Sequence, residues 1–158
     1  MHACRRNMDI AVICINNFIY REVGGEEAPG DFDKLAFSPY LLFEKPLNIP
    51  HMARSCGSVY VARWTPLQAN ELANSISDAL ERTGLSVIDV ISPPSDLLDF
   101  YHKNSEIKND EDTNNVGIEK DKKIVVGKFF ECERPTFIDA YNKQLLEVLG
   151  DKFVKIEV

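Results

Sequence analysis

Two adjacent asparagines, Asn16 and Asn17, are the side chains of this sequence best suited to hold a ligand at a defined place. They follow directly on an apolar run, residues 10–15, that is typical of a buried β-strand. Amide and main-chain carbonyl oxygens are hard ligands that suit Mg²⁺, an ion that commonly links protein oxygens to substrate phosphates. Gly24 and Gly25 would let backbone N–H groups approach such a phosphate. The alternative is a plain strand-to-loop turn with asparagine as the turn residue.

The elements that would position these residues predict an α/β fold, with a mostly parallel sheet flanked by helices. Ligands of such sheets bind beyond the carboxyl ends of the strands, which is where Asn16 and Asn17 fall. Thr65-Pro66 predicts a helix start, Gly84 its end, and Thr136 the cap of a later helix. The expected helices cover residues 2–7, 49–55, 65–84 and 136–149, the last with Phe137, Ala140, Tyr141, Leu145 and Val148/Leu149 on one face; the expected strands cover 9–15, 58–63, 85–91, 123–129 and, at an edge, 153–158.

Composition excludes several classes of protein. The chain has 158 residues, enough for one compact domain, and a net charge of −7, which argues against nucleic acid or an anionic membrane as partner. The apolar run at 10–15 is shorter than a signal-peptide core or a membrane span. The four cysteines have no metal-ligand spacing and predict free, mostly buried thiols, so we expect a cytoplasmic protein.

The stretch HACRRNMDIAVICINNFIY, residues 2–20, with Gly24-Gly25 after it, resembles the thiamine-diphosphate-binding region of the β subunits of 2-oxoacid:ferredoxin oxidoreductases. The similarity continues through CGSVYVAR (56–63), ISDALERTGLSVIDVISP (76–93) and VVGKFFECERPTF (125–137). It covers most of the chain and implies that residues 1–102 are the C-terminal part of a thiamine-diphosphate-binding domain. Residues 103–123, about half of them charged, predict a flexible linker, and 124–158 a strand-helix-strand segment.

The resemblance implies roles for individual residues. Asn17 would be the side-chain ligand of Mg²⁺, Ile19 would add its carbonyl oxygen, and Tyr20 would lie against the diphosphate, in a segment that also holds Asn16, Gly24 and Gly25. The implied reaction is oxidative decarboxylation of a 2-oxoacid to acyl-coenzyme A, with electrons passing through iron–sulfur clusters to ferredoxin. No catalytic residue is assigned to this chain.

Departures from the family pattern lie close to these residues. The family's Y-G-M-T-G-G-Q is here Y-R-E-V-G-G-E, residues 20–26. Val23 removes a hydroxyl group, and Glu22 and Glu26 bring negative charge toward a diphosphate, which Arg21 offsets only in part. The Gly-Asp-Gly half of the family motif and a cysteine-bearing cluster region are absent from this sequence, and we expect them in a missing region or in a partner.

Three hypotheses follow. In the first, the chain is a β-type subunit, or a fragment of one, that works in a hetero-oligomer with an α-type subunit and ferredoxin and is inactive alone. In the second, it is a non-catalytic interaction module that kept the fold and lost cofactor binding. Both predict a partner, because a sheet without its first unit exposes an apolar edge and face. In the third, it is an unrelated α/β domain.

Overall fold

The structure, a computed structural model, describes residues 1–16, 47–92, 105–107, 119–120 and 123–156. Its helices are α1 (His2–Arg6), α2 (Ile49–Cys56), α3 (Ala69–Glu81) and α5 (Phe137–Leu149), with 3₁₀ turns η2 (Pro66–Gln68) and η5 (Gly150–Lys152); its strands are β1 (Ala11–Asn16), β2 (Tyr60–Trp64), β3 (Ser86–Ile91), β4 (Ser105–Ile107), β5 (Glu119–Lys120) and β6 (Lys123–Glu131).

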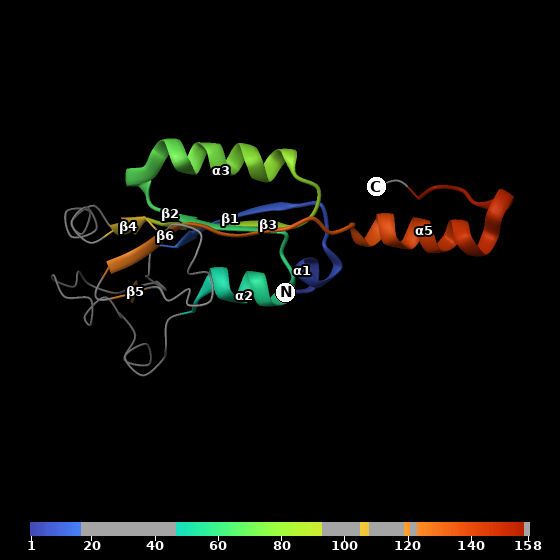
Figure 1. Cartoon of the computed structure of the whole chain (residues 1–158), viewed down its shortest axis with the longest axis horizontal. Coiled ribbons are helices and arrows are strands. Elements are labelled where there is room, and N and C mark those ends of the chain that lie inside the picture. The colour runs from blue at the N-terminus through green and yellow to red at the C-terminus, as the bar shows by residue number, and fades with distance from the viewer. Residues whose placement is uncertain (17–46, 93–104, 108–118, 121–122, 157–158) are drawn as a thin grey trace, which may run out of the picture.

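These strands form one sheet in the order β1-β3-β2-β6-β4, with β5 paired to β6. Strands β1, β3 and β2 are parallel, β6 runs antiparallel to β2, and β4 is parallel to β6. Helix α3 covers one face, α1 and α2 lie on the other, and α5 extends away from the sheet (Figure 1). The predicted α/β fold with a mostly parallel sheet is confirmed.

Local capping signals explain where two helices begin. The Thr65 side chain accepts from the Leu67 N–H, and Gln68 completes a capping box, so the chain enters α3 through η2. Thr136 forms the same kind of box with Asp139 at the start of α5. The predicted helix end at Gly84 is wrong, because α3 stops at Glu81.

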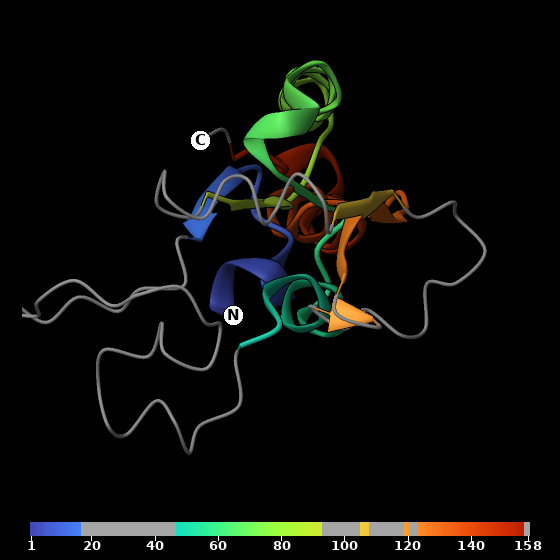
Figure 2. The ribbon, with the colours of Figure 1, turned by 90° about the vertical axis from the view of Figure 1, so that its left-hand side faces the viewer.

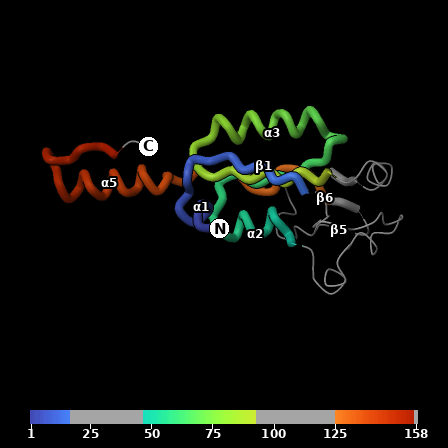
Figure 3. Tube along the Cα trace, turned by 180° about the vertical axis from the view of Figure 1, so that it is seen from behind, coloured from blue at the N-terminus to red at the C-terminus, as the bar shows by residue number. Residues whose placement is uncertain are grey.

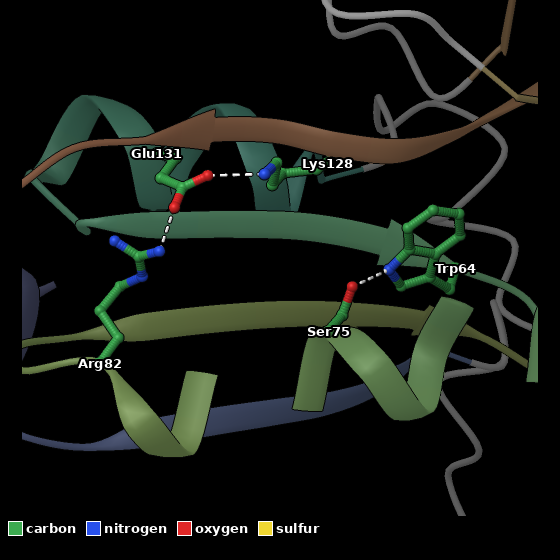
Figure 4. Close-up of polar contacts among 5 residues, drawn as sticks. All are labelled: Trp64, Ser75, Arg82, Lys128 and Glu131. Carbon is green, nitrogen blue, oxygen red and sulfur yellow. Dashed lines mark hydrogen bonds and ion pairs between the residues drawn. The ribbon is translucent and has the colours of Figure 1, made fainter. Parts of the chain in front are cut away.

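The face of the sheet under α3 holds the main core. Tyr60, Ala62 and Trp64 of β2 pack with neighbouring residues of β3 and β6, and α3 covers them. Trp64 donates from its indole nitrogen to the Ser75 hydroxyl at 2.6 Å, which satisfies the one polar atom of that ring (Figure 4).

At the other end of the same face, Glu131 of β6 accepts hydrogen bonds from Lys128 and from Arg82, which follows α3 (Figure 4). The hydrogen bond from Lys128, and then the nearby guanidinium charge, hold the pKa of the Glu131 carboxyl below its usual value. These groups are partly exposed, so the network attaches the end of α3 to β6 with little net stabilisation.

A buried amide joins distant segments at the amino end of the parallel strands. Asn7, only 1% exposed, donates from Nδ2 to the carbonyl oxygens of Arg134 (2.8 Å) and Pro135 (3.1 Å). Its Oδ1 accepts from the Leu85 N–H at 2.9 Å. Gly84 passes so close that a Cβ there would lie 2.6 Å from Oδ1 of Asn7. A side chain at position 84 would therefore force the Asn7 amide to move.

Arg134 extends the same network toward the other face. One of its terminal nitrogens donates to the carbonyl oxygens of Cys4 and Gly57, both at 2.7 Å. Asn7 and Arg134 together connect α1, the end of α2, the start of β3 and the root of α5; we call this set of contacts the Asn7–Arg134 network. Segments 127 to 130 residues apart in sequence are thereby held together by hydrogen bonds.

Several other expectations meet the structure directly. The predicted edge strand at the C-terminus is wrong for residues 153–156, because Asn142 of α5 bonds both the N–H and the carbonyl oxygen of Ile156, at 2.9 Å each. Strands β4 and β5 and the first residue of β6, Lys123, lie in the range expected to be a linker (103–123), and the rest of that range is outside the described residues. All four cysteines are free, but only Cys4 is buried. Among the described residues, no helix is long and apolar enough to cross a membrane.

Replacing Gly84 by alanine tests the close packing against Asn7. We expect Gly84→Ala to lower the free energy of unfolding by about 2 to 5 kcal/mol, from a positive φ (+108°) that alanine resists and from displaced hydrogen bonds of Asn7. The matched control is Gly150→Ala, also at positive φ (+53°) but with nothing within 4 Å of the added Cβ. Urea denaturation measures both, and equal losses would refute the packing argument.

Candidate cofactor-binding edge

The carboxyl ends of β1, β3 and β2 meet at one edge of the sheet, the side that faces the viewer in Figure 2. Asn16 is the last residue of β1 and lies in register with Ile91 of β3. Its carbonyl oxygen accepts from the Ser92 N–H at 2.8 Å, so the strand stays paired to its final residue. Asn16 therefore sits at the position where ligands of such sheets bind, as the sequence predicts.

The other predicted site residues are Asn17, Ile19, Tyr20, Gly24 and Gly25, and all lie outside the described residues. Only the placement of Asn16 can be compared with the sequence prediction. Because strand side chains alternate, Asn16 falls on the same face as Cys14, which is the face covered by α2.

A buried ion pair lies one step back from this edge, on the same face. Arg63 of β2 donates from Nε to Oδ2 of Asp89 at 2.8 Å, and both side chains are 0% exposed. Asp89 is in register with Cys14 on its other side, so the three residues form a row across the parallel strands. The Arg63 guanidinium also lies 5.8 Å from the centre of the Phe129 ring.

Sequence reasoning did not single out this pair. Its signal is the single charged residue in each of two otherwise apolar strands, SVYVAR and LSVIDVI. Charges in buried strands require partners, and adjacent parallel strands would bring opposite charges together. A buried pair is often no more stabilising than apolar residues of the same size, so this pair is weak evidence for a gain in stability.

The pair alters the chemistry of its row. Burial lowers the pKa of the Arg63 guanidinium, and the charge and hydrogen bond of Asp89 oppose that shift. Burial, and then the charge of Asp89, raise the pKa of the Cys14 thiol. At a given pH, less of the Cys14 side chain is therefore in the nucleophilic thiolate form than in an ordinary cysteine.

An open cleft of about 620 Å³ lies at the opposite end of the sheet. It is lined by Asp78 and Glu81 of α3, by Arg82 and Thr83 after the helix, and by residues 132–135 before α5. The cleft is therefore separate from the carboxyl edge where Asn16 lies.

Comparison with known proteins identifies the fold family. Residues 1–90 match the family model described as "Thiamine pyrophosphate enzyme, C-terminal TPP binding domain". The chain belongs to this thiamine pyrophosphate enzyme family. The fold of the described residues agrees, because a 2-oxoglutarate:ferredoxin oxidoreductase from Magnetococcus marinus superposes with a TM-score of 0.70 over 94% of this chain and 56% of that one, at 22% identity.

Two curated relatives are similar along nearly the whole chain, and a third is similar along about two thirds of it. The "2-oxoglutarate synthase subunit KorB" of Methanocaldococcus jannaschii is 34% identical in an alignment that covers 94% of this chain and 60% of the relative. The protein of that name from Methanothermobacter marburgensis is 31% identical over all of this chain and 59% of its own length. The "2-oxoacid:ferredoxin oxidoreductase subunit beta" of Saccharolobus solfataricus is 31% identical over 64% of this chain and 34% of its own length. The chain thus spans about three-fifths of the KorB relatives, and the resemblance read from the sequence is confirmed.

Breaking the buried pair from one side is expected to be severe. Asp89→Ala leaves the Arg63 charge buried without its carboxylate and lowers the free energy of unfolding by about 3 to 5 kcal/mol. The control, Glu131→Ala, removes a partly exposed carboxylate that also bonds basic side chains, and its loss is about 1 kcal/mol or less. Urea denaturation compares them, and similar losses would show that Arg63 is not electrostatically dependent on Asp89.

The Cys14 thiol provides a pH test of the same row. In the folded chain, its rate of alkylation by iodoacetamide should rise with a midpoint at higher pH than in the urea-unfolded chain, because the raised pKa leaves less thiolate at a given pH. Mass spectrometry of the labelled peptide gives both profiles. A folded midpoint equal to or below the unfolded one would contradict the assignment.

Proposed function

We propose that this chain is part of a β-type subunit of a 2-oxoacid:ferredoxin oxidoreductase and that its carboxyl edge binds the Mg²⁺-diphosphate end of thiamine diphosphate. The observation that carries the proposal is the position of Asn16, at the carboxyl end of β1 in a sheet of this family. The names of the relatives support the reaction class, since they are a 2-oxoglutarate synthase subunit and a 2-oxoacid:ferredoxin oxidoreductase β subunit.

In this proposal, the residues after Asn16 hold the metal and the diphosphate. Asn17 donates its side-chain oxygen and Ile19 its carbonyl oxygen to Mg²⁺, while Tyr20, Gly24 and Gly25 lie along the diphosphate. An amide and a carbonyl oxygen fit Mg²⁺, which takes oxygen ligands and keeps phosphate oxygens in its remaining positions. When bound, thiamine diphosphate supplies a carbon nucleophile for the 2-oxoacid carbonyl, with loss of CO₂, and the protein's part is to bind and orient.

The proposal also requires partners. Among the described residues β1 pairs only with β3, and its apolar side chains are exposed, Ile15 by 65%. An uncovered apolar edge strand without charge, proline or bulge invites further protein. We propose that an α-type subunit, and the parts of a β-type subunit that this chain does not span, complete the site, and that electrons leave through iron–sulfur clusters in those parts to ferredoxin.

A second candidate function is a non-catalytic interaction module. The observation that favours it is the sequence Arg21-Glu22-Val23, which places a carboxylate and no hydroxyl where the family segment approaches the diphosphate. The two candidates differ in one property: the module keeps its partners and binds no cofactor.

Cofactor binding by an Asn17 variant separates the two candidate functions. In the complex of this chain with its partner subunits, Asn17→Ala is expected to weaken Mg²⁺-dependent binding of thiamine diphosphate by at least about 10-fold, since even indirect supports of a metal site cost that much. Isothermal titration calorimetry measures the affinity, and Asn70→Ala, an exposed amide on α3, is the control. Unchanged affinity would refute the assigned ligand, and no binding by the unmodified complex would leave the interaction module.

A further inference from the structure

The segment from Phe137 to Ile156, here called the C-terminal arm, stands off the sheet as a separate projection (Figures 1 and 3). It consists of α5, the turn η5 and an irregular segment, residues 153–156, that runs back along the helix. Asn142, 8% exposed, fastens the return to the helix through both hydrogen bonds to Ile156. One side of α5 is therefore covered by the chain itself.

The root of the arm is held firmly. The carbonyl oxygens of Arg134 and Pro135, the two residues before its cap, accept hydrogen bonds from Asn7. The Arg134 side chain donates hydrogen bonds to carbonyl oxygens of α1 and of the end of α2. The Thr136 capping box then starts the helix. Because buried hydrogen bonds fix the chain immediately before α5, the helix leaves the sheet in a set direction.

The open side of α5 carries an uncharged stripe. Phe137, Tyr141 and Val148 are spaced by four and seven residues and are 50%, 42% and 76% exposed. The rings of Phe137 and Tyr141 stack, with centres 6.0 Å apart and planes 5° from parallel. The charged residues Asp139 and Lys143 fall on the opposite side of the helix, and Glu147 lies beside the stripe. Exposed aromatic stripes of this kind are typical of a helix that enters an apolar groove.

The charges around this stripe indicate what covers it. The Arg6 guanidinium lies 5.9 Å from the centre of the Phe137 ring, and Arg5 and Arg6 end α1 beside the root of the arm. A groove with a carboxylate at the root end would complement them. A second copy of this chain is disfavoured, because each copy carries a net charge of −7.

We propose that the C-terminal arm docks, through Phe137, Tyr141 and Val148, into an apolar groove with a carboxylate at one end on a non-identical subunit, the α-type subunit of the complex. This inference rests on the proposed function for the identity of the partner. The relatives' names, subunit KorB and subunit beta, support a partner of a different kind. The Asn7–Arg134 network gives the arm its direction before the partner binds.

The test uses the complex of this chain with the α-type subunit, followed by native mass spectrometry on dilution. Tyr141→Asp and Val148→Asp are each expected to raise the dissociation constant at least about 10-fold, as buried interface anchors do. The matched control is Leu146→Asp, on the charged side of α5 and 52% exposed, which should leave it unchanged. Tyr141→Phe should also bind normally, and equal helicity by circular dichroism excludes unfolding.

Three results would overturn the inference: an unchanged complex in the stripe variants, an equal loss in Leu146→Asp, or a change only in the number of copies of this chain. The thiamine diphosphate content of the unmodified complex is measured separately. A complex without the cofactor whose assembly depends on the stripe would refute the proposed function and support the arm. A complex that contains the cofactor and whose assembly is unchanged by the stripe variants would refute the docking role of the arm and leave the proposed function.

Discussion

The buried amide of Asn7 is the contact on which the arrangement of this chain depends. Its side chain, which is 1% exposed, joins α1 to the start of β3 and to the root of α5, across 127 residues of sequence. Arg134 adds α2 to the same cluster. The requirement for glycine at position 84 follows from this packing, because the turn into β3 has no room for a side chain beside Asn7. The direction of the C-terminal arm follows from it as well.

This network changes the meaning of the sequence resemblance. Asn7 in HACRRN, Gly57 in CGSVYVAR, Gly84 in ERTGLSV and Arg134 in ECERPTF all lie together at the amino end of the parallel strands. Their contacts in the structure are with each other, which is a structural role. Of the six residues that the sequence predicts for the cofactor site, only Asn16 is among the described residues, and it lies at the carboxyl edge. Much of the similarity therefore reports the fold, whereas the proposed cofactor binding rests on a few residues after β1, where this sequence also departs from the family pattern.

Elements with local signals could be predicted from the sequence, and contacts between distant residues could not. Thr65 and Thr136 start helices because their capping boxes involve residues three positions away, and the apolar runs of β1 and β3 need no partner to be recognised. Arg63 and Asp89 are 26 positions apart and become a pair only through strand order. The alternation in FVKIEV resembles a strand, but Asn142, 14 residues away, takes the backbone groups of Ile156. For the candidate site, the place of Asn16 was predictable, because the apolar run of the strand ends at residue 15 and Asn16 follows it directly.

The two ends of the parallel strands thus differ: the amino end holds the chain and its arm together, and the carboxyl edge is the proposed place of cofactor binding within an assembly. Native mass spectrometry of the chain purified gently from its own organism tests this most directly. The account predicts an assembly heavier than one chain, which includes a subunit of another kind and the mass of thiamine diphosphate. A chain that is found alone, or only with copies of itself, and without any cofactor mass would contradict it.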